Sequence, residues 1–346
     1  MTAPVLKGFR VGGLLIDPPL LLAPMAGITH LAFRQLVVRY GGCGLFMSEM
    51  LSARAVPHEN PTRSFFLKRG PDESPFFYQL VGNDPGHMTR AIQWLEQSSE
   101  EAGIPVNGFD INMGCAAPPI RNSGRGVGLM KTPGLAGRIV SACRRVTRLP
   151  LTAKLRLGWE ESFDETLAFV RILENEGIDA VTLHPRLAKE KFTRRARWEY
   201  VMHLKRAAQV PLIGNGDIRS ETNVFQRLQE TGCDGVMIGR LAVQKPWIFG
   251  TTSGAVVDSI IDLRELYLEF ARLLTLECPE ERRIGRLREF TPYYALNFRF
   301  GHRLASAVQN APTLETALEE AARFFERNSD ELLVRTGMDL QPLFKT

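Results

Sequence analysis

Three residues that commonly carry chemistry stand in or directly after short apolar segments of strand length. Lys154 lies within such a segment, whereas Cys115 and His184 stand at the ends of theirs. If these segments are the strands of a parallel barrel, their C-terminal ends meet at one mouth, where barrel enzymes carry their active sites. The three side chains would then converge on one site.

Lys154 would point into a crowded interior, where a charged group is costly unless an anion meets it. It would serve as a Schiff-base lysine or as a cation beside an anionic cofactor ring. The plain structural alternative is an interior ion pair with Glu49. His184 alone would be a satisfied structural histidine, but its place at a strand end opposite Lys154 favours contact with a ligand.

Cys115 precedes the segment Ala116-Ala117-Pro118-Pro119, which predicts a loop rather than a helix and argues against burial in an apolar core. An unperturbed thiol has a pKa of about 8.5 and is mostly protonated at neutral pH. That state suits a general acid as well as a nucleophile, and both roles stay open.

Glycines follow the last two apolar segments, at Gly216 and at Gly239, the latter next to Arg240. Loops at these places in a barrel often bind a phosphate through backbone N–H groups. The alternative is that the glycines only make tight turns. A further cluster, residues 124–128, stands too far from its strand for a dinucleotide loop and predicts a mobile loop beside the site. No GxxxxGK[ST] segment is present, which excludes a P-loop.

The elements that must position these residues are eight apolar segments separated by helical patterns. Helical spacing with clear ends is visible, for example, at residues 133–148, 163–176 and 221–231. Strands that alternate with helices form parallel βαβ units, and eight of them predict an α/β protein with a (β/α)8 TIM barrel rather than a doubly wound sheet. The predicted strands are residues 20–23, 45–47, 76–80, 108–112, 151–155, 180–184, 211–214 and 235–238.

The pattern changes beyond Phe249. Residues 259–276, 281–308 and 314–325 predict amphipathic helices, and no further strands are expected. We therefore expect a barrel domain at residues 1–250 and a smaller all-helical domain at residues 257–346, with a hinge at 251–254. A length of 346 residues accommodates both, because a barrel needs about 250 residues.

Composition sets outer limits on the class of protein. With 44% hydrophobic and 23% charged residues and a net charge of +5, the chain is an ordinary globular protein, which argues against disorder. None of its five cysteines forms a CxxC motif, so we expect no metal site. The sequence has neither an apolar run long enough for a membrane span nor a secretory signal. We expect a cytoplasmic monomer without membrane contact.

Seven segments, in order over about residues 20 to 250, together resemble the tRNA-dihydrouridine synthase family of FMN-dependent reductases, in which a barrel is joined to a helical domain. The segments are Ala23-Pro24-Met25-Ala26-Gly27, Ser48-Glu49-Met50, Asp110-Ile111-Asn112-Met113-Gly114-Cys115, Lys154-Leu155-Arg156-Leu157-Gly158, His184-Pro185-Arg186, Asn215-Gly216-Asp217-Ile218 and Met237-Ile238-Gly239-Arg240, continued by Pro246-Trp247.

The resemblance implies that NADPH reduces FMN and that the reduced flavin reduces the C5=C6 bond of a uridine in tRNA, with Cys115 as the proton donor. Lys154 suits this chemistry, because a cation stabilises negative charge on the flavin ring. The implied FMN contacts are Pro24, Met25, Ala26, Gln79, Lys154 and His184, with the phosphate near Asn215, Gly216, Asp217, Gly239 and Arg240. The implied substrate contacts are Asn112, Glu49, Arg156 and Arg186.

A uridine must leave its stack to reach the mouth of a barrel, so the protein must hold folded RNA, mostly through phosphate and shape contacts. Two basic segments are candidates for these RNA contacts. The alternative for each is a solvated face with its aromatic residues in the core. The first is Arg186, Lys189, Lys191, Arg194, Arg195 and Arg197. The second is Arg282, Arg283, Arg286, Arg288, Arg299 and Arg303, interleaved with Tyr293, Tyr294, Phe298 and Phe300.

The sequence departs from the family pattern in the loop after Cys115. Ala116, Pro118 and Pro119 stand where the family usually has a proline and a pair of lysines, and Pro185 stands where a glycine is usual. These differences leave open the target nucleotide and the RNA class, tRNA or another structured RNA such as rRNA. Two other functions also stay open. They are an FMN-dependent small-molecule reductase of the dihydroorotate dehydrogenase or enoate reductase type, and a non-catalytic RNA-binding relative.

Overall fold

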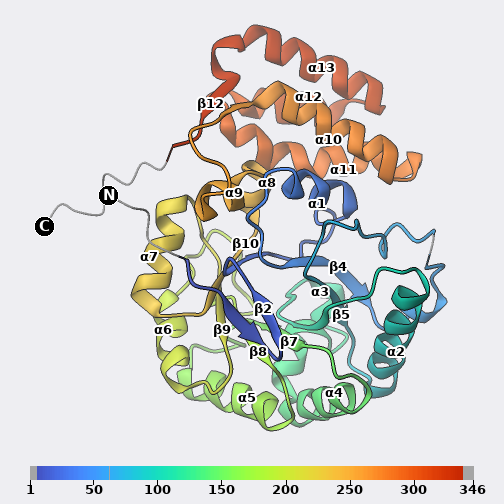
Figure 1. The fold of residues 1–346 in the computed structure, drawn as a ribbon, viewed down its shortest axis with the longest axis vertical. Coiled ribbons are helices and arrows are strands. Elements are labelled where there is room, and N and C mark those ends of the chain that lie inside the picture. Colours follow the sequence, from blue (N-terminus) through green and yellow to red (C-terminus); the bar gives the residue numbers. More distant parts are fainter. Residues whose placement is uncertain (1–5, 62, 338–346) are drawn as a thin grey trace, which may run out of the picture.

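The structure is a computed structural model that describes residues 6–61 and 63–337, and its centre is a barrel of eight parallel strands (Figure 1). The strands follow the chain order from β4 to β10, and β3 lies beside β10. All eight predicted strands are present. They are β3 (Leu20–Leu22), β4 (Phe46–Ser52), β5 (Phe76–Val81), β6 (Gly108–Met113), β7 (Leu151–Leu155), β8 (Ala180–Leu183), β9 (Leu212–Asn215) and β10 (Gly235–Ile238).

The first and last strands of the series close the ring. β3 pairs with β10 in parallel, with Leu20 opposite Val236, and β3 meets β4 at a bridge between Leu21 and Leu45. The backbone N–H of Leu22 donates to the carbonyl of Leu45 at 3.0 Å. The closed ring confirms the predicted (β/α)8 barrel and excludes the doubly wound sheet.

Amphipathic helices surround the barrel, and their ends follow local sequence signals. Side chains of Asp84, Ser162 and Ser220 cap three of them by accepting backbone N–H bonds in the first turn. Gly232, at φ +66°, ends one of the predicted helices. The surrounding helices are α1 (Leu31–Val38), α2 (Pro85–Glu101), α4 (Pro133–Val146), α5 (Phe163–Asn175), α6 (Trp198–Ala207), α7 (Glu221–Thr231) and the short α8 (Arg240–Gln244).

A hairpin that the sequence analysis missed closes the end of the barrel opposite the mouth. It consists of β1 (Phe9–Val11) and β2 (Leu14–Ile16), and it lies in front of the strands in Figure 1. Val11 and Ile16 are buried and pack with barrel residues such as Ile213 and Met237. With this end sealed, the C-terminal ends of the strands are the accessible face.

The chain after the barrel forms a helical layer over α1 and α8 (Figure 1). Its core is a cluster of aromatic rings that includes Tyr267, Phe290, Tyr294 and Phe325. The elements are α9 (Ile248–Ser253), β11 (Ile260–Asp262), α10 (Leu263–Glu277), α11 (Glu280–Tyr294), the 3-10 helix η3 (Ala295–Asn297), α12 (Gly301–Asn310), α13 (Leu314–Arg327) and β12 (Leu333–Arg335).

Three expectations about this part of the chain were wrong. β11 and β12 pair as a small antiparallel sheet where no strand was expected. The long helix expected at 281–308 is two helices, because the chain turns at residues 295–300, where Gly301 packs against the carbonyl of Ala295. The expected hinge is also mostly helical: Thr251 and Thr252 are buried in α9, which ends at Gly254.

The domain boundaries at 1–250 and 257–346 stay a prediction, and residues 1–5 and 338–346 of these ranges lie outside the described residues. No helix among residues 6–61 and 63–337 has the length and apolar character needed to cross a bilayer.

Candidate active site

A pocket of about 130 Å³ opens at the C-terminal ends of the barrel strands. It brings together every predicted cofactor residue except Ala26, which is exposed beside it, and Gln79, which lies in the core. Its lining is Ala23, Pro24, Met25, Lys154, His184, Phe192, Asn215, Gly216, Asp217, Ile218, Met237, Gly239 and Arg240. Residues from five strands, far apart in the sequence, thus share one cavity.

Lys154 is one of the two cations that line this pocket, the other being Arg240. It stands on β7, opposite Asn112 of β6 and Thr182 of β8. Burial lowers its pKa to about 8, although the carboxyl group of Asp110 acts in the opposite direction. The alternative of an ion pair with Glu49 is wrong, because Glu49 faces Arg286 at 3.8 Å. Within the described part of the chain no carboxylate forms an ion pair with Lys154, so its ammonium is available to an anionic ligand.

Beneath Lys154 lies a buried hydrogen-bonded chain that the sequence analysis did not assign. Asp110 accepts bonds from Thr152 at 2.6 Å and from the amide of Gln79 at 2.7 Å. The amide oxygen of Gln79 in turn accepts a bond from Asn112 at 2.8 Å. Both ends of the Gln79 side chain are therefore hydrogen-bonded within the protein, and its contact with a cofactor stays a prediction. Asp110 stood within a motif of the family resemblance, but nothing in that motif indicated this role.

Asn112 connects this chain to Cys115. Its amide oxygen accepts the backbone N–H of Cys115 at 2.9 Å, and the Cys115 side chain is half-buried beside the pocket. The carbonyl of Cys115 accepts the N–H of Val127 at 3.1 Å. Both backbone polar groups of Cys115 are therefore hydrogen-bonded, which fixes the turn that carries the thiol.

The glycine cluster 124–128 is not the expected mobile loop. It leads into a 3-10 helix, η2 (Gly126–Lys131), that packs against the Cys115 turn. Gly126 has φ +57°, and a Cβ at this position would lie 2.6 Å from the carbonyl oxygen of Cys115. Only glycine permits so close an approach in this backbone conformation. The residues after Cys115 also form a short helix, α3 (Pro118–Arg121), where a loop was expected.

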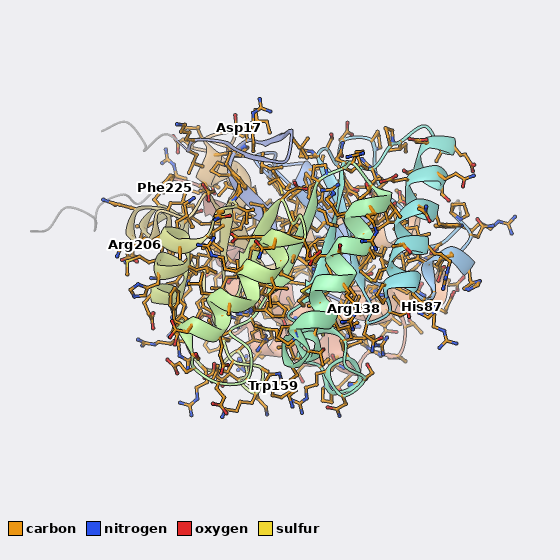
Figure 2. All side chains as sticks on the ribbon, turned by 90° about the horizontal axis from the view of Figure 1, so that it is seen from below. Asp17, His87, Arg138, Trp159, Arg206 and Phe225 are labelled. Atoms are coloured by element: carbon orange, nitrogen blue, oxygen red, sulfur yellow. The ribbon has the colours of Figure 1, made fainter. Side chains whose placement is uncertain are left out.

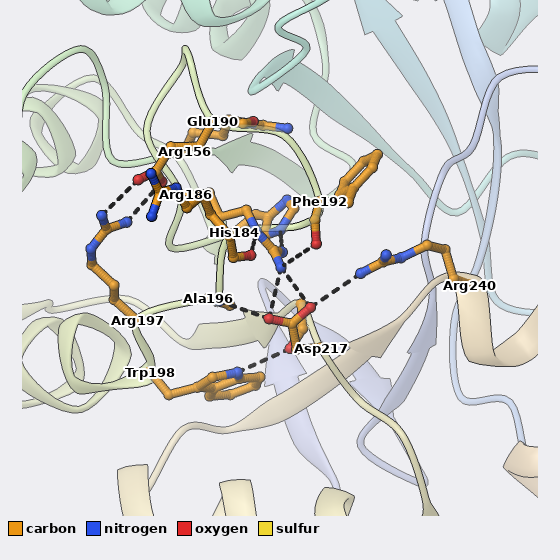
Figure 3. Close-up of polar contacts among 12 residues, drawn as sticks. Arg156, His184, Arg186, Glu190, Phe192, Ala196, Arg197, Trp198, Asp217 and Arg240 are labelled. Carbon is orange, nitrogen blue, oxygen red and sulfur yellow. Dashed lines mark hydrogen bonds and ion pairs between the residues drawn. The ribbon is translucent and has the colours of Figure 1, made fainter.

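His184 and Asp217 are joined through a buried arginine (Figure 3). One Arg186 nitrogen lies 2.6 Å from Nε2 of His184, and another lies 2.6 and 2.7 Å from the two oxygens of Asp217. An arginine only donates, so Nε2 of His184 accepts and the ring is neutral. Burial, followed by the charge of Lys154, holds the His184 pKa well below its usual value.

Asp217 holds the arginines at this end of the pocket. Burial acts to raise the pKa of its carboxyl group, but hydrogen bonds from Arg186 and from the Ala196 N–H outweigh that effect and lower it. Arg240 also donates to Asp217, at 3.1 Å. The Asp217 carboxylate thus joins the side chains of Arg186 and Arg240.

All four predicted substrate contacts are bonded within the protein, Asn112 through Gln79 and Cys115 as described above. Arg186 is fully buried. Arg156 donates to the carbonyls of Leu187 and Glu190 and so supports the loop after β8. Glu49 accepts the N–H of Gly27, and burial raises its pKa. The charged groups of Arg186, Arg156 and Glu49 support loops around the site, whereas Asn112 bonds the Cys115 backbone.

The predicted basic surfaces divide into exposed and internally bonded residues. Arg197 pairs with Glu190 at 2.7 Å and with Glu161 at 3.0 Å, while Arg283 and Arg288 donate to backbone carbonyls. Arg286 pairs with Glu289 at 2.8 Å and faces Glu49. The exposed basic residues are Lys189, Lys191, Arg194, Arg195, Arg282, Arg299 and Arg303. Of the interleaved aromatic residues, Tyr294 and Phe298 are buried, Tyr293 is half-buried and Phe300 is exposed.

Phe192 is a site residue that the sequence analysis overlooked. Its ring is 54% exposed, lies nearly parallel to His184 at 6.1 Å, and has the Arg240 guanidinium 4.7 Å from its centre (Figure 3). The sequence feature that could have identified Phe192 is its place as a single aromatic residue in a segment rich in lysine and arginine, residues 189–195.

The fold and the pocket define a (β/α)8-barrel protein with a cationic site at the mouth of the barrel. Its family follows from its sequence: a model described as dihydrouridine synthase (Dus) matches residues 21–322, and the chain belongs to this family.

Curated relatives agree with this assignment. A probable tRNA-dihydrouridine synthase of Rickettsia bellii is 34% identical over 69% of this chain and 72% of its own. A protein with the same description from Mycobacterium tuberculosis is 31% identical over 88% of this chain and 82% of its own. tRNA-dihydrouridine synthase B of Xanthomonas campestris is 31% identical over 92% and 96%.

Solved structures support the fold alone. A 2-naphthoyl-CoA reductase complex matches with a TM-score of 0.55 and 10% identity over 72% of this chain. A histamine dehydrogenase from Rhizobium matches with a TM-score of 0.52 and 10% identity over 78% of this chain. This chain spans about half the length of each, 52% and 51% respectively.

Proposed function

We propose that the protein is a flavin-dependent tRNA-dihydrouridine synthase that binds FMN, takes electrons from NADPH and reduces the C5=C6 bond of uridines in tRNA. The observation that carries the proposal is the pocket at the barrel mouth, with Lys154 in no ion pair among the described residues, in a chain of the dihydrouridine synthase family. The printed names of the relatives favour tRNA as the substrate.

The lining of the pocket offers groups that suit both parts of FMN. The ammonium of Lys154 would stabilise negative charge on the flavin ring. Backbone N–H groups at Gly216 and Gly239 and the guanidinium of Arg240 would suit the phosphate. When bound, FMN would supply the transfer of electrons from the nicotinamide to the uracil.

In the reduction of the uracil by the reduced flavin, the protein would supply a proton and a binding site for the base. The Cys115 thiol would give its proton to C5 of the uracil as a general acid. Asn112, held by Gln79 and bonded to the Cys115 backbone, would orient the uracil against the thiol. The buried chain that ends at Asp110 supports this role, because it limits the motion of Asn112.

The RNA would be held by the exposed lysines and arginines on either side of the mouth, since a flipped base leaves its duplex in contact with the protein surface. Lys189, Lys191, Arg194 and Arg195 follow β8, and Arg282, Arg299 and Arg303 belong to the helical layer. We further propose that the protein works as a cytoplasmic monomer.

Mapping dihydrouridine in RNA from cells with and without this protein tests the proposal. We expect specific positions in tRNA to lose dihydrouridine when the protein is absent. A purified protein that stays colourless after incubation with FMN would contradict the redox function. If dihydrouridine is lost from rRNA alone, the substrate is rRNA and not tRNA.

A further inference from the structure

A second pocket, of about 370 Å³, lies next to the proposed cofactor site, where the barrel meets the helical layer. We propose that it is a subsite for one nucleotide of the RNA, with the base against Tyr293 and Leu296 and the phosphate at Arg219. This inference rests on the function proposed above and specifies where that function holds its substrate.

The two pockets share a wall. Phe192, Asp217 and Arg240 line both of them, and the Arg240 guanidinium lies 4.7 Å from the centre of the Phe192 ring. Figure 3 shows Arg240 reaching from α8 toward Asp217. A nucleotide on the far side of this wall would border the proposed cofactor pocket.

The charges of the second pocket suit a phosphate. Asp217 is the carboxylate of the shared wall, and the buried Arg186 already balances its charge through two hydrogen bonds. Arg219 is exposed and has no ion-pair partner within residues 6–61 and 63–337, and the Arg240 side chain is 39% exposed. The Arg219 guanidinium thus remains for an anion, and a guanidinium is well matched to phosphate oxygens.

The opposite wall is apolar and held in place. Tyr293 of α11 is half-buried, whereas Leu296 of η3 is 66% exposed. The Asn297 side chain donates to the carbonyl of Gln244 at 2.7 Å and so ties η3 to α8, which carries Arg240. A fixed apolar surface facing guanidinium groups suits a nucleotide, since bases stack on such surfaces while arginines contact the backbone.

The surface beyond the pocket favours RNA over the dinucleotide reductant. Four residues after Leu296, the exposed ring of Phe300 has the guanidinium groups of Arg299 and Arg303 at 5.4 and 5.1 Å from its centre. Cationic and aromatic groups therefore continue along the helical layer, as on proteins that bind single-stranded nucleic acid. A dinucleotide would have no use for this extension.

Variants of the exposed pocket residues test the subsite through the Kd of an unmodified tRNA transcript, measured over a series of salt concentrations. Arg219→Ala removes one guanidinium from the phosphate and should weaken binding about fivefold to tenfold and reduce the log–log salt slope by about one. Leu296→Glu should weaken binding at least as much, because its carboxylate would repel phosphate.

Arg206→Ala is the matched control. Arg206 is an exposed arginine in the last turn of α6, at the barrel end away from the mouth, and is labelled in Figure 2. Its variant should bind tRNA within about twofold of the wild type, as expected for a residue that touches no phosphate. Retained flavin absorbance and an unchanged Tm show that each variant is folded.

Three outcomes would overturn the inference. If Arg219→Ala and Leu296→Glu bind tRNA with the same Kd as Arg206→Ala, the pocket is not an RNA subsite. The proposed function is then unaffected, because the wild type still binds tRNA. If these variants instead raise the KM for NADPH without changing the tRNA Kd, the pocket belongs to the reductant. If the wild type binds no tRNA, the proposed function fails and the subsite fails with it.

Discussion

At the scale of single residues, we expect Lys154 to determine how flavin reduction depends on pH. Burial lowers its pKa to about 8, so the ammonium is present below this pH and disappears as the pH rises through it. Since the charged form stabilises negative charge on the ring, the rate of flavin reduction by NADPH without RNA should fall above about pH 8. Stopped-flow absorbance from about pH 6.5 to about pH 9.5 measures this rate on both sides of the Lys154 pKa.

The variant Lys154→Met should be slow at every pH and should lack this decline. Cys115→Ala serves as the control, because a thiol that acts only on the uracil leaves the flavin half-reaction unaffected. A wild-type rate that stays flat as the pH rises past the Lys154 pKa would refute the assignment of Lys154.

Cys115 should matter only in the half-reaction with RNA. We expect Cys115→Ala to bind flavin and to be reduced by NADPH, but to form dihydrouridine about a hundredfold more slowly or worse, the usual contribution of a general acid. Cys43→Ala is the matched control, since Cys43 is also half-buried but donates to the carbonyl of Leu45 at the opposite end of the barrel. Product formation by Cys115→Ala at the wild-type rate would exclude the acid role.

The sequence was informative about which residues gather at the mouth and less informative about what their charges do. The strand ends identify Lys154, His184 and Arg240 because the barrel brings all strand ends together. Arg186 was interpreted as a substrate contact, yet its guanidinium is bonded to Asp217, 31 positions further along the chain. Such a pairing depends on the tertiary structure, and no local pattern reports it.

At the scale of elements, α11 is linked to the loop that carries Pro24 and Met25. Glu49 of β4 accepts the N–H of Gly27 in this loop, and Arg286 of α11 faces the same carboxylate at 3.8 Å. The side chains of Arg286 and Glu49 are nearly buried, at 12% and 6% exposed. The helical layer thereby helps to fix one wall of the cofactor pocket.

Arg286→Met should therefore destabilise the protein and weaken its hold on flavin. Leaving a buried carboxylate without its partner costs about 3 kcal/mol, which urea unfolding would detect. Fluorescence titration should show a weaker Kd for FMN, because the loop at 24–27 loses its support. The control Glu289→Gln changes the other, half-exposed partner of Arg286 and should alter the stability by less than about 1 kcal/mol. Equal effects of the two variants would contradict the link.

The elements differed in how well the sequence predicted them. Each barrel strand is an apolar run between helices, so all eight were predicted to within a few residues. The strands of the two small antiparallel pairs, β1–β2 and β11–β12, have three residues each, too few for a periodic pattern to emerge. The break between α11 and α12 was hidden because aromatic and basic residues continue through it.

At the scale of the whole molecule, the net charge of +5 conceals two kinds of arginine beside the mouth. Arg194 and Arg195 are exposed, and no carboxylate pairs with their side chains in the described part of the chain. Arg197, two positions on, is held by Glu161 and Glu190, and its hydrogen bonds lower the pKa of Glu190 to about 2. Only the first kind has its charge free for RNA.

This difference predicts unlike responses to salt. Replacing both Arg194 and Arg195 by alanine should lower the log–log slope of tRNA affinity against salt by about two, one for each arginine that neutralises a phosphate. Arg197→Ala should leave that slope unchanged, because its charge is already neutralised within the protein. If Arg197→Ala reduces the slope equally, RNA displaces the carboxylates of Glu161 and Glu190 from Arg197. If the slope of the double variant is unchanged, Arg194 and Arg195 do not contact the RNA, and its phosphates are bound by the helical layer instead.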